Sequence, residues 1–170
     1  YRLYANVASM SDALYWVNVD NIGFDVITDS QNIISLNASV EYKPFSSLLL
    51  GAGFKGMYYD NGADVESGKP AFLADFAVRY THRKFAIGAT AEAMGSRSWT
   101  FIDTTATNGG GISSHKYPAC VDLGLTFDWF VAKQCTVYVE GRNLANAKIY
   151  DWALYRRLGA GAVVGIKVQF

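Results

Sequence analysis

The chain has 170 residues, with 15 Lys and Arg against 15 Asp and Glu, so its formal net charge is zero. A chain of this length fits one domain, and its charge balance gives no electrostatic reason to expect a nucleic-acid partner. No apolar run reaches the roughly 18 residues that a membrane-spanning helix requires. Aromatic residues nevertheless make up 15% of the chain, which is high for a soluble protein.

The N-terminal part gives weak signals of β structure. Residues 1–9 alternate faintly between apolar and polar side chains, which indicates a strand, and residues 10–13 are expected to form a short turn. Residues 14–27 are rich in aromatic and β-branched side chains but alternate imperfectly. The Asp20-Asn21 pair indicates a bulge or bend within that stretch.

From residue 33 onward the alternation of apolar and polar side chains becomes regular, as expected for strands with one apolar face. The predicted strands cover residues 34–42, 48–58, 72–80, 85–93, 119–129, 136–142 and 160–170. They are longer than the roughly 5–6 residues usual in globular sheets and suit the length of about 9–11 residues that a tilted membrane strand needs. The last strand ends on an aromatic residue, Phe170, as outer-membrane barrels often do.

The connections between these strands alternate between short and long. Short connections are expected at 43–46, 81–83 and 131–134, and long ones at 60–69, 95–116 and 143–159. Outer-membrane barrels combine short periplasmic turns with long extracellular loops. We therefore predict an all-β fold, an antiparallel up-and-down transmembrane β-barrel of eight or nine strands, alone or as part of a larger barrel. The bacterial outer membrane is the expected location, with the C-terminus on the periplasmic side.

The two faces of these strands differ in chemistry. One face carries almost only apolar side chains, which would overfill the interior of a small soluble barrel, although a soluble or lipocalin-like barrel remains an alternative. The apolar face is therefore expected to contact lipid, and the polar face to line a wet lumen. The predicted polar network of the lumen comprises Glu41, Lys55, Asp75, Arg79, Glu92, Asp122, Asp128, Glu140, Arg142 and Lys167.

Aromatic and basic side chains gather in two of the predicted outer loops. They could capture an extracellular ligand or contact the phosphates of lipopolysaccharide. The alternative is that they pack the loops and form an aromatic girdle at the membrane surface. The candidate ligand-binding residues are Trp99, Phe101, Tyr150, Trp152, Tyr155, Arg156 and Arg157.

Two motifs in the 95–116 segment contain residue types that occur in catalytic or phosphate-binding sites. Ser113-Ser114-His115 offers a nucleophile and a base, but the two types are adjacent in sequence and no orienting acid is identifiable. We therefore expect no enzymatic activity. The run at 108–111, N-G-G-G, lacks the Lys-Ser/Thr and the strand-to-helix context of a phosphate-binding loop, so a flexible loop is the better interpretation.

The two cysteines are not expected to form a disulfide. The alternation places Cys120 on the inward face of one strand and Cys135 on the outward face of the next, and such a pair cannot meet disulfide geometry. Two cysteines and two distant histidines also make a metal site or a cofactor unexpected.

The C-terminal segment resembles the end of TonB-dependent receptors. Residues 137–152 read V-Y-V-E-G-R-N-L-A-N-A-K-I-Y-D-W, and that family typically has a penultimate strand that runs into an N-L-x-N element followed by Tyr. Asn143, Leu144, Asn146 and Tyr150 correspond to that element. The final strand corresponds more loosely to the glycine-containing closing strand of the family, through Gly161, Gly165 and Phe170.

This resemblance implies uptake of a ligand too large for porins, with energy supplied by TonB acting on a plug domain that these 170 residues do not contain. The implied partners are outer-membrane lipid and lipopolysaccharide, an unknown extracellular ligand, and the barrel assembly machinery. That machinery would read the closing strand as a C-terminal signal, carried by Val164, Ile166, Val168 and Phe170.

Receptors of this family have a plug and 22 strands, so the domain assignment stays open. Residues 1–170 are either a single β-barrel domain or the C-terminal barrel fragment of a receptor. Nine strands would favour the fragment, because closed bacterial barrels normally have an even number of strands. Eight strands could close alone as a small barrel with a structural or adhesive role. An outer-membrane barrel hydrolase ranks behind both.

Overall fold

The computed structural model describes residues 1–170 apart from 63–64, 106–110 and 170. The described part is all-β, and no helix in it is long and apolar enough to cross a membrane. Its strands are β1 (Arg2–Val19), β2 (Gly23–Phe45), β3 (Leu48–Asn61), β4 (Phe72–Thr81), β5 (Phe85–Met94), β6 (Arg97–Asp103), β7 (Gly111–Tyr117), β8 (Cys120–Ala132), β9 (Cys135–Arg142), β10 (Tyr150–Trp152), β11 (Tyr155–Arg156) and β12 (Gly161–Val168).

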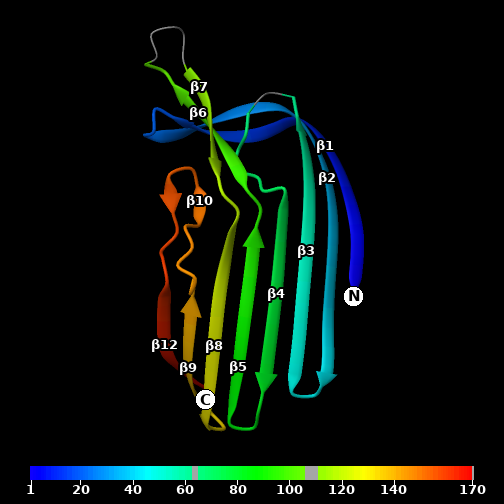
Figure 1. The fold of residues 1–170 in the computed structure, drawn as a ribbon, viewed down its shortest axis with the longest axis vertical. Coiled ribbons are helices and arrows are strands. Elements are labelled where there is room, and N and C mark those ends of the chain that lie inside the picture. The colour runs from blue at the N-terminus through cyan, green and yellow to red at the C-terminus, as the bar shows by residue number, and fades with distance from the viewer. Residues whose placement is uncertain (63–64, 106–110, 170) are drawn as a thin grey trace.

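One large, mostly antiparallel sheet dominates the molecule, in the strand order β12-β9-β8-β5-β4-β3-β2-β1-β6-β7, while β10 and β11 form a separate hairpin. The long strands run side by side (Figure 1), joined at one end, the turn end, by the three short connections that the sequence predicted. The other end, the loop end, carries the β6–β7 and β10–β11 hairpins (Figure 1). The predicted all-β, antiparallel architecture is thus confirmed.

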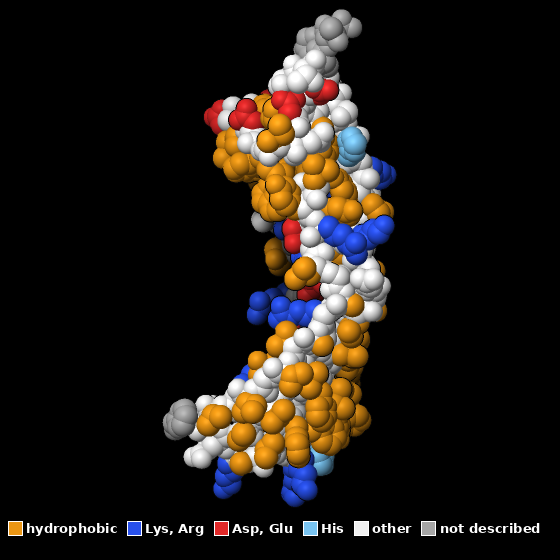
Figure 2. Space-filling model, turned by 90° about the vertical axis from the view of Figure 1, so that its left-hand side faces the viewer, with side chains coloured by type: hydrophobic (Ala, Val, Ile, Leu, Met, Phe, Trp, Pro, Cys, Tyr) orange, Lys and Arg blue, Asp and Glu red, His pale blue; other side chains and the backbone are white. Residues whose placement is uncertain are grey.

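The sheet does not close on itself within the described residues. β12 pairs only with β9, and β1 pairs with β2 along its length and with β6 at its last residues. The space-filling view in Figure 2 accordingly shows a crescent, with Lys, Arg, Asp and Glu side chains in its hollow and hydrophobic side chains gathered over its lower part. An open crescent leaves the outer backbone edge of β12, and that of β1 apart from its last residues, free for further pairing.

Two predictions about the N-terminal part are wrong. Residues 10–13 are not a turn, because β1 continues through them with a register shift between Met10 and Ala13, which is a β-bulge. The stretch 14–27 is not one bent strand but the tip of the β1–β2 hairpin. Asp20 and Asn21 have φ of 52° and 56°, a left-handed conformation that Asp and Asn tolerate well and that suits a hairpin turn.

The prediction of a long loop at 95–116 is also wrong, because this segment contains the β6–β7 hairpin. Trp99 and Phe101 alternate there with Ser98 and Thr100, and the Ser, Thr and Gly content of the segment hides this strand pattern. Most of the N-G-G-G run at 108–111, for which the sequence predicts a flexible loop, lies outside the described residues. β6 also pairs with the end of β1 in parallel, through Phe101 opposite Asn18 and Ile102 opposite Val19.

The two faces of the sheet have the predicted character. Along β8, alternate residues are exposed and half-buried. The exposed set on the apolar face is Val121, Leu123, Leu125, Phe127 and Trp129. On the polar face, Asp75 of β4, Glu92 of β5 and Asp122 of β8 lie in register across three strands. We refer to these three carboxylates as the acidic row.

Glycines on the polar face make room for neighbouring polar side chains. A Cβ on Gly53 would lie 2.3 Å from Oδ1 of Asp75, and one on Gly165 would lie 2.5 Å from the Tyr138 ring. The same Tyr138 ring receives the ammonium of Lys167 at 4.6 Å from its centroid, a cation–π contact. Glycine in these strands therefore permits side chains to lie flat against the sheet.

Candidate functional site

Three hairpins meet at the loop end through aromatic side chains. Trp152 of β10 lies at the centre, with its ring centroid 6.1 Å from Trp16 of β1, 5.9 Å from Phe24 of β2 and 5.6 Å from Trp99 of β6. Tyr155 of β11 completes this aromatic cluster at 6.0 Å from Phe24. These separations fall within the range in which aromatic rings attract one another. The cluster therefore ties segments together that are far apart in sequence.

A small core lies beneath the cluster. Trp99 and Phe101 are only 3% and 6% exposed, and Ala153 packs with them. The tip of the β1–β2 hairpin is fixed to the same place, because the Asp20 N–H donates to the Ile102 carbonyl at 2.9 Å. The structure thus gives Trp99 and Phe101 a position under the site, and their predicted contact with ligand stays a prediction.

An open apolar pocket of about 380 Å³ lies on the exposed side of the cluster, lined by Trp16, Phe24, Trp152 and Tyr155. Trp16, Trp152 and Tyr155 are exposed to solvent there. A concave apolar surface of aromatic rings is suited to bind a flat apolar group. Sequence reasoning found Trp152 and Tyr155 but missed Trp16 and Phe24, although both aromatic residues flank the Asp20-Asn21 turn signal.

The remaining predicted ligand-binding residues do not line this pocket and have different roles. The Tyr150 ring contacts the Tyr117 ring in a tilted arrangement, with centroids 4.7 Å apart, and the Tyr150 carbonyl accepts a hydrogen bond from Arg97. Arg156 is exposed and makes no ion pair within the described part of the chain. Arg157 instead binds Asp151 and Asp122, so of the two arginines Arg156 is the one free to meet an anion.

The β3–β4 connection supports the loop end from the other side. The ammonium of Lys69 donates to Oε1 of Gln31 at 2.6 Å and lies 5.1 Å and 5.7 Å from the ring centroids of Tyr15 and Tyr59. Burial lowers the pKa of Lys69 from its ordinary value. The preceding Gly68, with φ of 69°, lies against the Trp99 ring, where a Cβ would come within 2.1 Å. A glycine is required there by both conformation and space.

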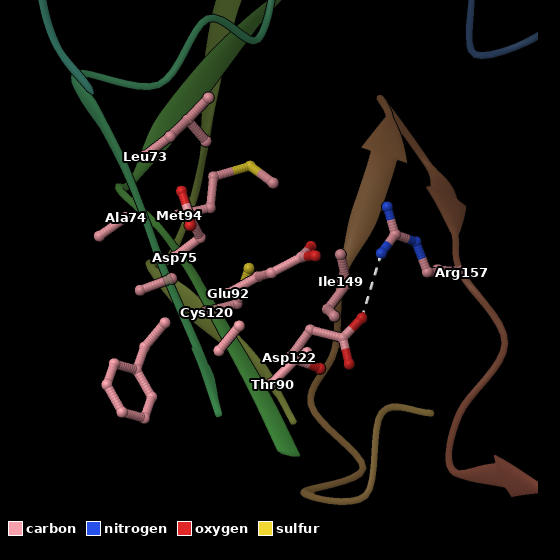
Figure 3. A pocket seen from close by; sticks show the side chains of 13 residues that line it. Leu73, Ala74, Asp75, Thr90, Glu92, Met94, Cys120, Asp122, Ile149 and Arg157 are labelled. Carbon is pink, nitrogen blue, oxygen red and sulfur yellow. Dashed lines mark hydrogen bonds and ion pairs between the residues drawn. The ribbon is translucent and has the colours of Figure 1, made fainter. Parts of the chain in front are cut away.

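A second pocket, of about 400 Å³, opens on the polar face beside the β10–β11 hairpin. The acidic row lines it, and Figure 3 shows Arg157 reaching from the hairpin toward Asp122. Their closest atoms, Nη1 and Oδ2, are 3.2 Å apart. Arg157 also holds the pKa of the Asp151 carboxyl below its usual range, chiefly by hydrogen bonding to it.

Two ion pairs form within the predicted polar network in the described residues. Arg79 and Asp128 form an ion pair at 2.7 Å, diagonally across β5, and Arg142 and Glu140 form another at 2.7 Å. The structure places the whole predicted set on one face. In the described residues, six members have no ion pair with another member, namely Glu41, Lys55, Asp75, Glu92, Asp122 and Lys167.

The candidate chemical groups are not arranged for catalysis. Ser114 and His115 occupy successive positions of β7 and so point to opposite faces of the strand. The Ser114 hydroxyl donates to the Glu66 carboxylate, and the His115 ring packs on Phe101. Cys120 and Cys135 are free thiols. No group of three or more potential metal ligands is found in the described ranges.

Comparison with solved structures identifies the fold. The chain is similar to the copper transporter OprC (11% identity, TM-score 0.70, 99% of this chain and 28% of that one). It is also similar to Pseudomonas aeruginosa FpvA bound to a heterologous pyoverdine with iron (10% identity, TM-score 0.72, 99% and 25%) and to FpvAI in complex with pyocin S2 (11%, 0.73, 99% and 25%). No protein-family model and no curated protein matches the chain.

These similar structures are TonB-dependent receptors, so the predicted resemblance is confirmed at the level of fold. The match covers almost the whole of this chain but only about a quarter of each receptor structure. The chain therefore has the architecture of one section of a receptor barrel. Sequence identity of this size carries no information about the ligand.

Proposed function

We propose that this chain is the C-terminal section of a TonB-dependent outer-membrane receptor that takes up a ligand too large for porins. The observation that carries the proposal is the exposed aromatic pocket. Two hairpins, β1–β2 and β10–β11, form it at the loop end of a sheet whose fold matches such receptors over 99% of this chain. In a receptor barrel the long extracellular loops lie at that end.

The chemistry of the two faces supports a membrane location. We propose that the apolar face contacts outer-membrane lipid and lipopolysaccharide and that the polar face lines the lumen. The C-terminus then lies on the periplasmic side, where the barrel assembly machinery would engage β12. Val164, Ile166 and Val168 are exposed on its apolar face, and the predicted fourth member of that signal, Phe170, lies outside the described residues.

We further propose that additional strands of the same barrel pair with the free edges of β1 and β12. Unpaired backbone groups in lipid cost several kcal/mol each, so open sheet edges do not occur there. A plug domain acted on by TonB belongs to the same proposal. An antibody against this chain should therefore detect an outer-membrane protein much heavier than 18.6 kDa. A band near that mass would instead support the complete small barrel with a structural or adhesive role.

The pocket itself defines the class of ligand that we propose. Its lining by Trp16, Phe24, Trp152 and Tyr155 favours a flat apolar group. Arg156, the exposed residue after Tyr155, has no ion pair among the described residues and favours an anionic substituent nearby. Copper, iron–pyoverdine and pyocin S2 are named for the similar structures, and we do not propose them as ligands of this chain.

Naphthalene disulfonate, a flat ring system with anionic groups that does not enter lipid, is a suitable probe for this site. Trp152→Ala should weaken its binding to the vesicle-reconstituted protein about tenfold, because an aromatic pair contributes about 0.5–1.5 kcal/mol beyond burial of area. Binding is measured by saturation-transfer NMR. The control is Trp129→Ala, which removes an exposed tryptophan from the apolar face and should leave affinity unchanged. Equal affinities for the two variants would overturn the proposed site.

A further inference from the structure

We infer that Arg157 is a positioning residue, which holds the β10–β11 hairpin on the polar face of the sheet and thereby fixes the Trp152–Tyr155 side of the aromatic pocket. The inference concerns the shape of the unliganded protein, and it rests on the proposed function only for the consequence that ligand binding depends on it.

The guanidinium of Arg157 joins two carboxylates on different elements. Within the hairpin, its Nη2 and Nε donate to the two oxygens of Asp151 at 2.7 Å and 3.2 Å. Its Nη1 donates to Oδ2 of Asp122 on β8 at 3.2 Å, the contact drawn in Figure 3. The planar fork of arginine suits such a bridge, because its donors point in fixed and different directions. A lysine could not occupy both partners with the same geometry.

Asp122 is itself a fixed anchor. Its other oxygen, Oδ1, accepts the backbone N–H of Asn143 at 2.9 Å, at the base of the same connection. The connection between β9 and β12 is therefore attached to one carboxylate at both ends, through Asn143 where it begins and through Arg157 where it returns. Both attachments converge on a single side chain of the sheet.

The acidic row strengthens this attachment. Glu92 lies directly opposite Asp122 and Asp75 directly opposite Glu92, and like charges in such positions repel one another. Neither the Asp75 nor the Glu92 side chain has a hydrogen bond or an ion pair in the part of the chain that the structure describes. Their fields add to that of Asp122 and favour a cation at Arg157.

The aromatic residues of the hairpin depend on this contact. Trp152 pairs with Tyr155 across the hairpin, and Arg157 follows two residues later. Among the described residues, Arg157–Asp122 is the one ion pair between the hairpin and the sheet. The other connections are ring contacts, the packing of Ala153 against Trp99 and Phe101, a bond from the Leu154 N–H to the Tyr117 hydroxyl at 3.1 Å, and the bond from Arg97 to the Tyr150 carbonyl.

The proximity of three tryptophans offers a test that needs no ligand. Trp152 lies 5.6 Å from Trp99 and 6.1 Å from Trp16, so the indoles should give an exciton couplet in circular dichroism. The full-length protein is reconstituted into lipid vesicles, and the couplet is taken as the difference from the same protein carrying Trp152→Phe. We expect Asp122→Asn and Arg157→Gln each to lose at least half of its amplitude, and the double variant to lose no more.

Asp75→Asn is the matched control, since it makes the same change in the same row at a carboxylate without a partner, and it should keep the couplet. The native couplet should also weaken as salt screens the ion pair, whereas that of Asp122→Asn should not respond to salt. Heat-modifiable mobility in gels confirms that each variant is folded. If Asp122→Asn does not fold, Arg157→Gln is used to test the inference in its place.

Two results would overturn the inference. One is a full couplet in both Asp122→Asn and Arg157→Gln, and the other is a loss in Asp75→Asn as large as in Asp122→Asn. A lost couplet together with unchanged binding of naphthalene disulfonate would overturn the proposed ligand site instead and would leave the positioning role of Arg157 in place.

Discussion

Replacement of Leu125 by Arg is expected to destabilise the folded protein in a lipid bilayer by about 2–4 kcal/mol, the cost of a basic side chain at the midplane of the lipid face of a barrel. Leu125 lies near the middle of β8 on the apolar face and is 52% exposed. Its cross-strand neighbours, Ala89 and Gly141, are too small to shield a guanidinium from lipid. The measurement is urea unfolding of the protein reconstituted in vesicles.

Thr126→Arg is the matched control, because it places the same charge one residue further along β8 on the opposite face. Thr126 faces Glu140 on β9 and Gly88 on β5, so an arginine there meets a carboxylate and space rather than lipid. We expect a loss below about 1 kcal/mol, as for substitutions that face a lumen or a surface. Equal losses for the two variants would show that the apolar face does not contact lipid.

The contrast between these neighbours reflects what periodicity alone can predict. Alternation assigns Leu125 and Thr126 to opposite faces with no knowledge of their partners, because side chains in a strand alternate strictly. The same rule placed all ten residues of the polar network on one face. It could not predict the acidic row, since the alignment of Asp75, Glu92 and Asp122 depends on the register of three strands.

Within the 95–116 segment the composition hides the β6–β7 hairpin, and contact over long sequence separation hides the pairing of β6 with β1. β6 pairs with β1 through only two residue pairs, including Phe101 with Asn18, and so short a pairing leaves no periodic signal. Asn18 also explains why the 14–27 stretch alternated poorly. It is a polar residue that is buried next to the buried Val17, so burial does not alternate there, and its Oδ1 is buried without a hydrogen-bond partner within the described residues.

The candidate site was predictable from the sequence only in part. Trp152, Tyr155 and Trp99 were found because aromatic residues in polar connections stand out by composition. Trp16 and Phe24 belong to a stretch that was expected to form strand structure, where aromatic residues are common. Only the tertiary fold brings that hairpin across the loop end to meet the others (Figure 1).

The first asparagine of the N-L-x-N element has a structural role, and its replacement is expected to have the second large effect on stability. Asn143 is 2% exposed and has φ of 47°. Its amide donates to the Ala147 and Leu158 carbonyls at 3.0 Å and 3.2 Å and accepts from the Ala147 N–H at 2.8 Å. One side chain thus closes the connection from β9 to β12, in a conformation that asparagine adopts more readily than most residues.

Asn143→Ala is therefore expected to lower the free energy for opening this connection by about 3–4 kcal/mol. Three hydrogen bonds are lost at about 1 kcal/mol each, and alanine adds about 1 kcal/mol for its left-handed backbone. Amide hydrogen exchange of residues 144–158 should accelerate by a factor on the order of 100–1000. Asn143→Gly separates the two causes, because it loses the same hydrogen bonds but adopts the backbone conformation freely.

Asn146→Ala is the control within the same N-L-x-N element. It shows whether the effect comes from the hydrogen bonds of the Asn143 side chain or from any change in the element. Asn146 also has positive φ, 50°, but it is exposed and its Oδ1 accepts only a long hydrogen bond, 3.3 Å from the Ala160 N–H. The substitution loses that bond, at most about 1 kcal/mol, and adds about 1 kcal/mol for a left-handed alanine, so exchange should accelerate by about thirtyfold or less. If the two alanine variants exchanged alike, the connection would not depend on the Asn143 amide, and the backbone bond from Asn143 to Asp122 would be the better explanation of its order.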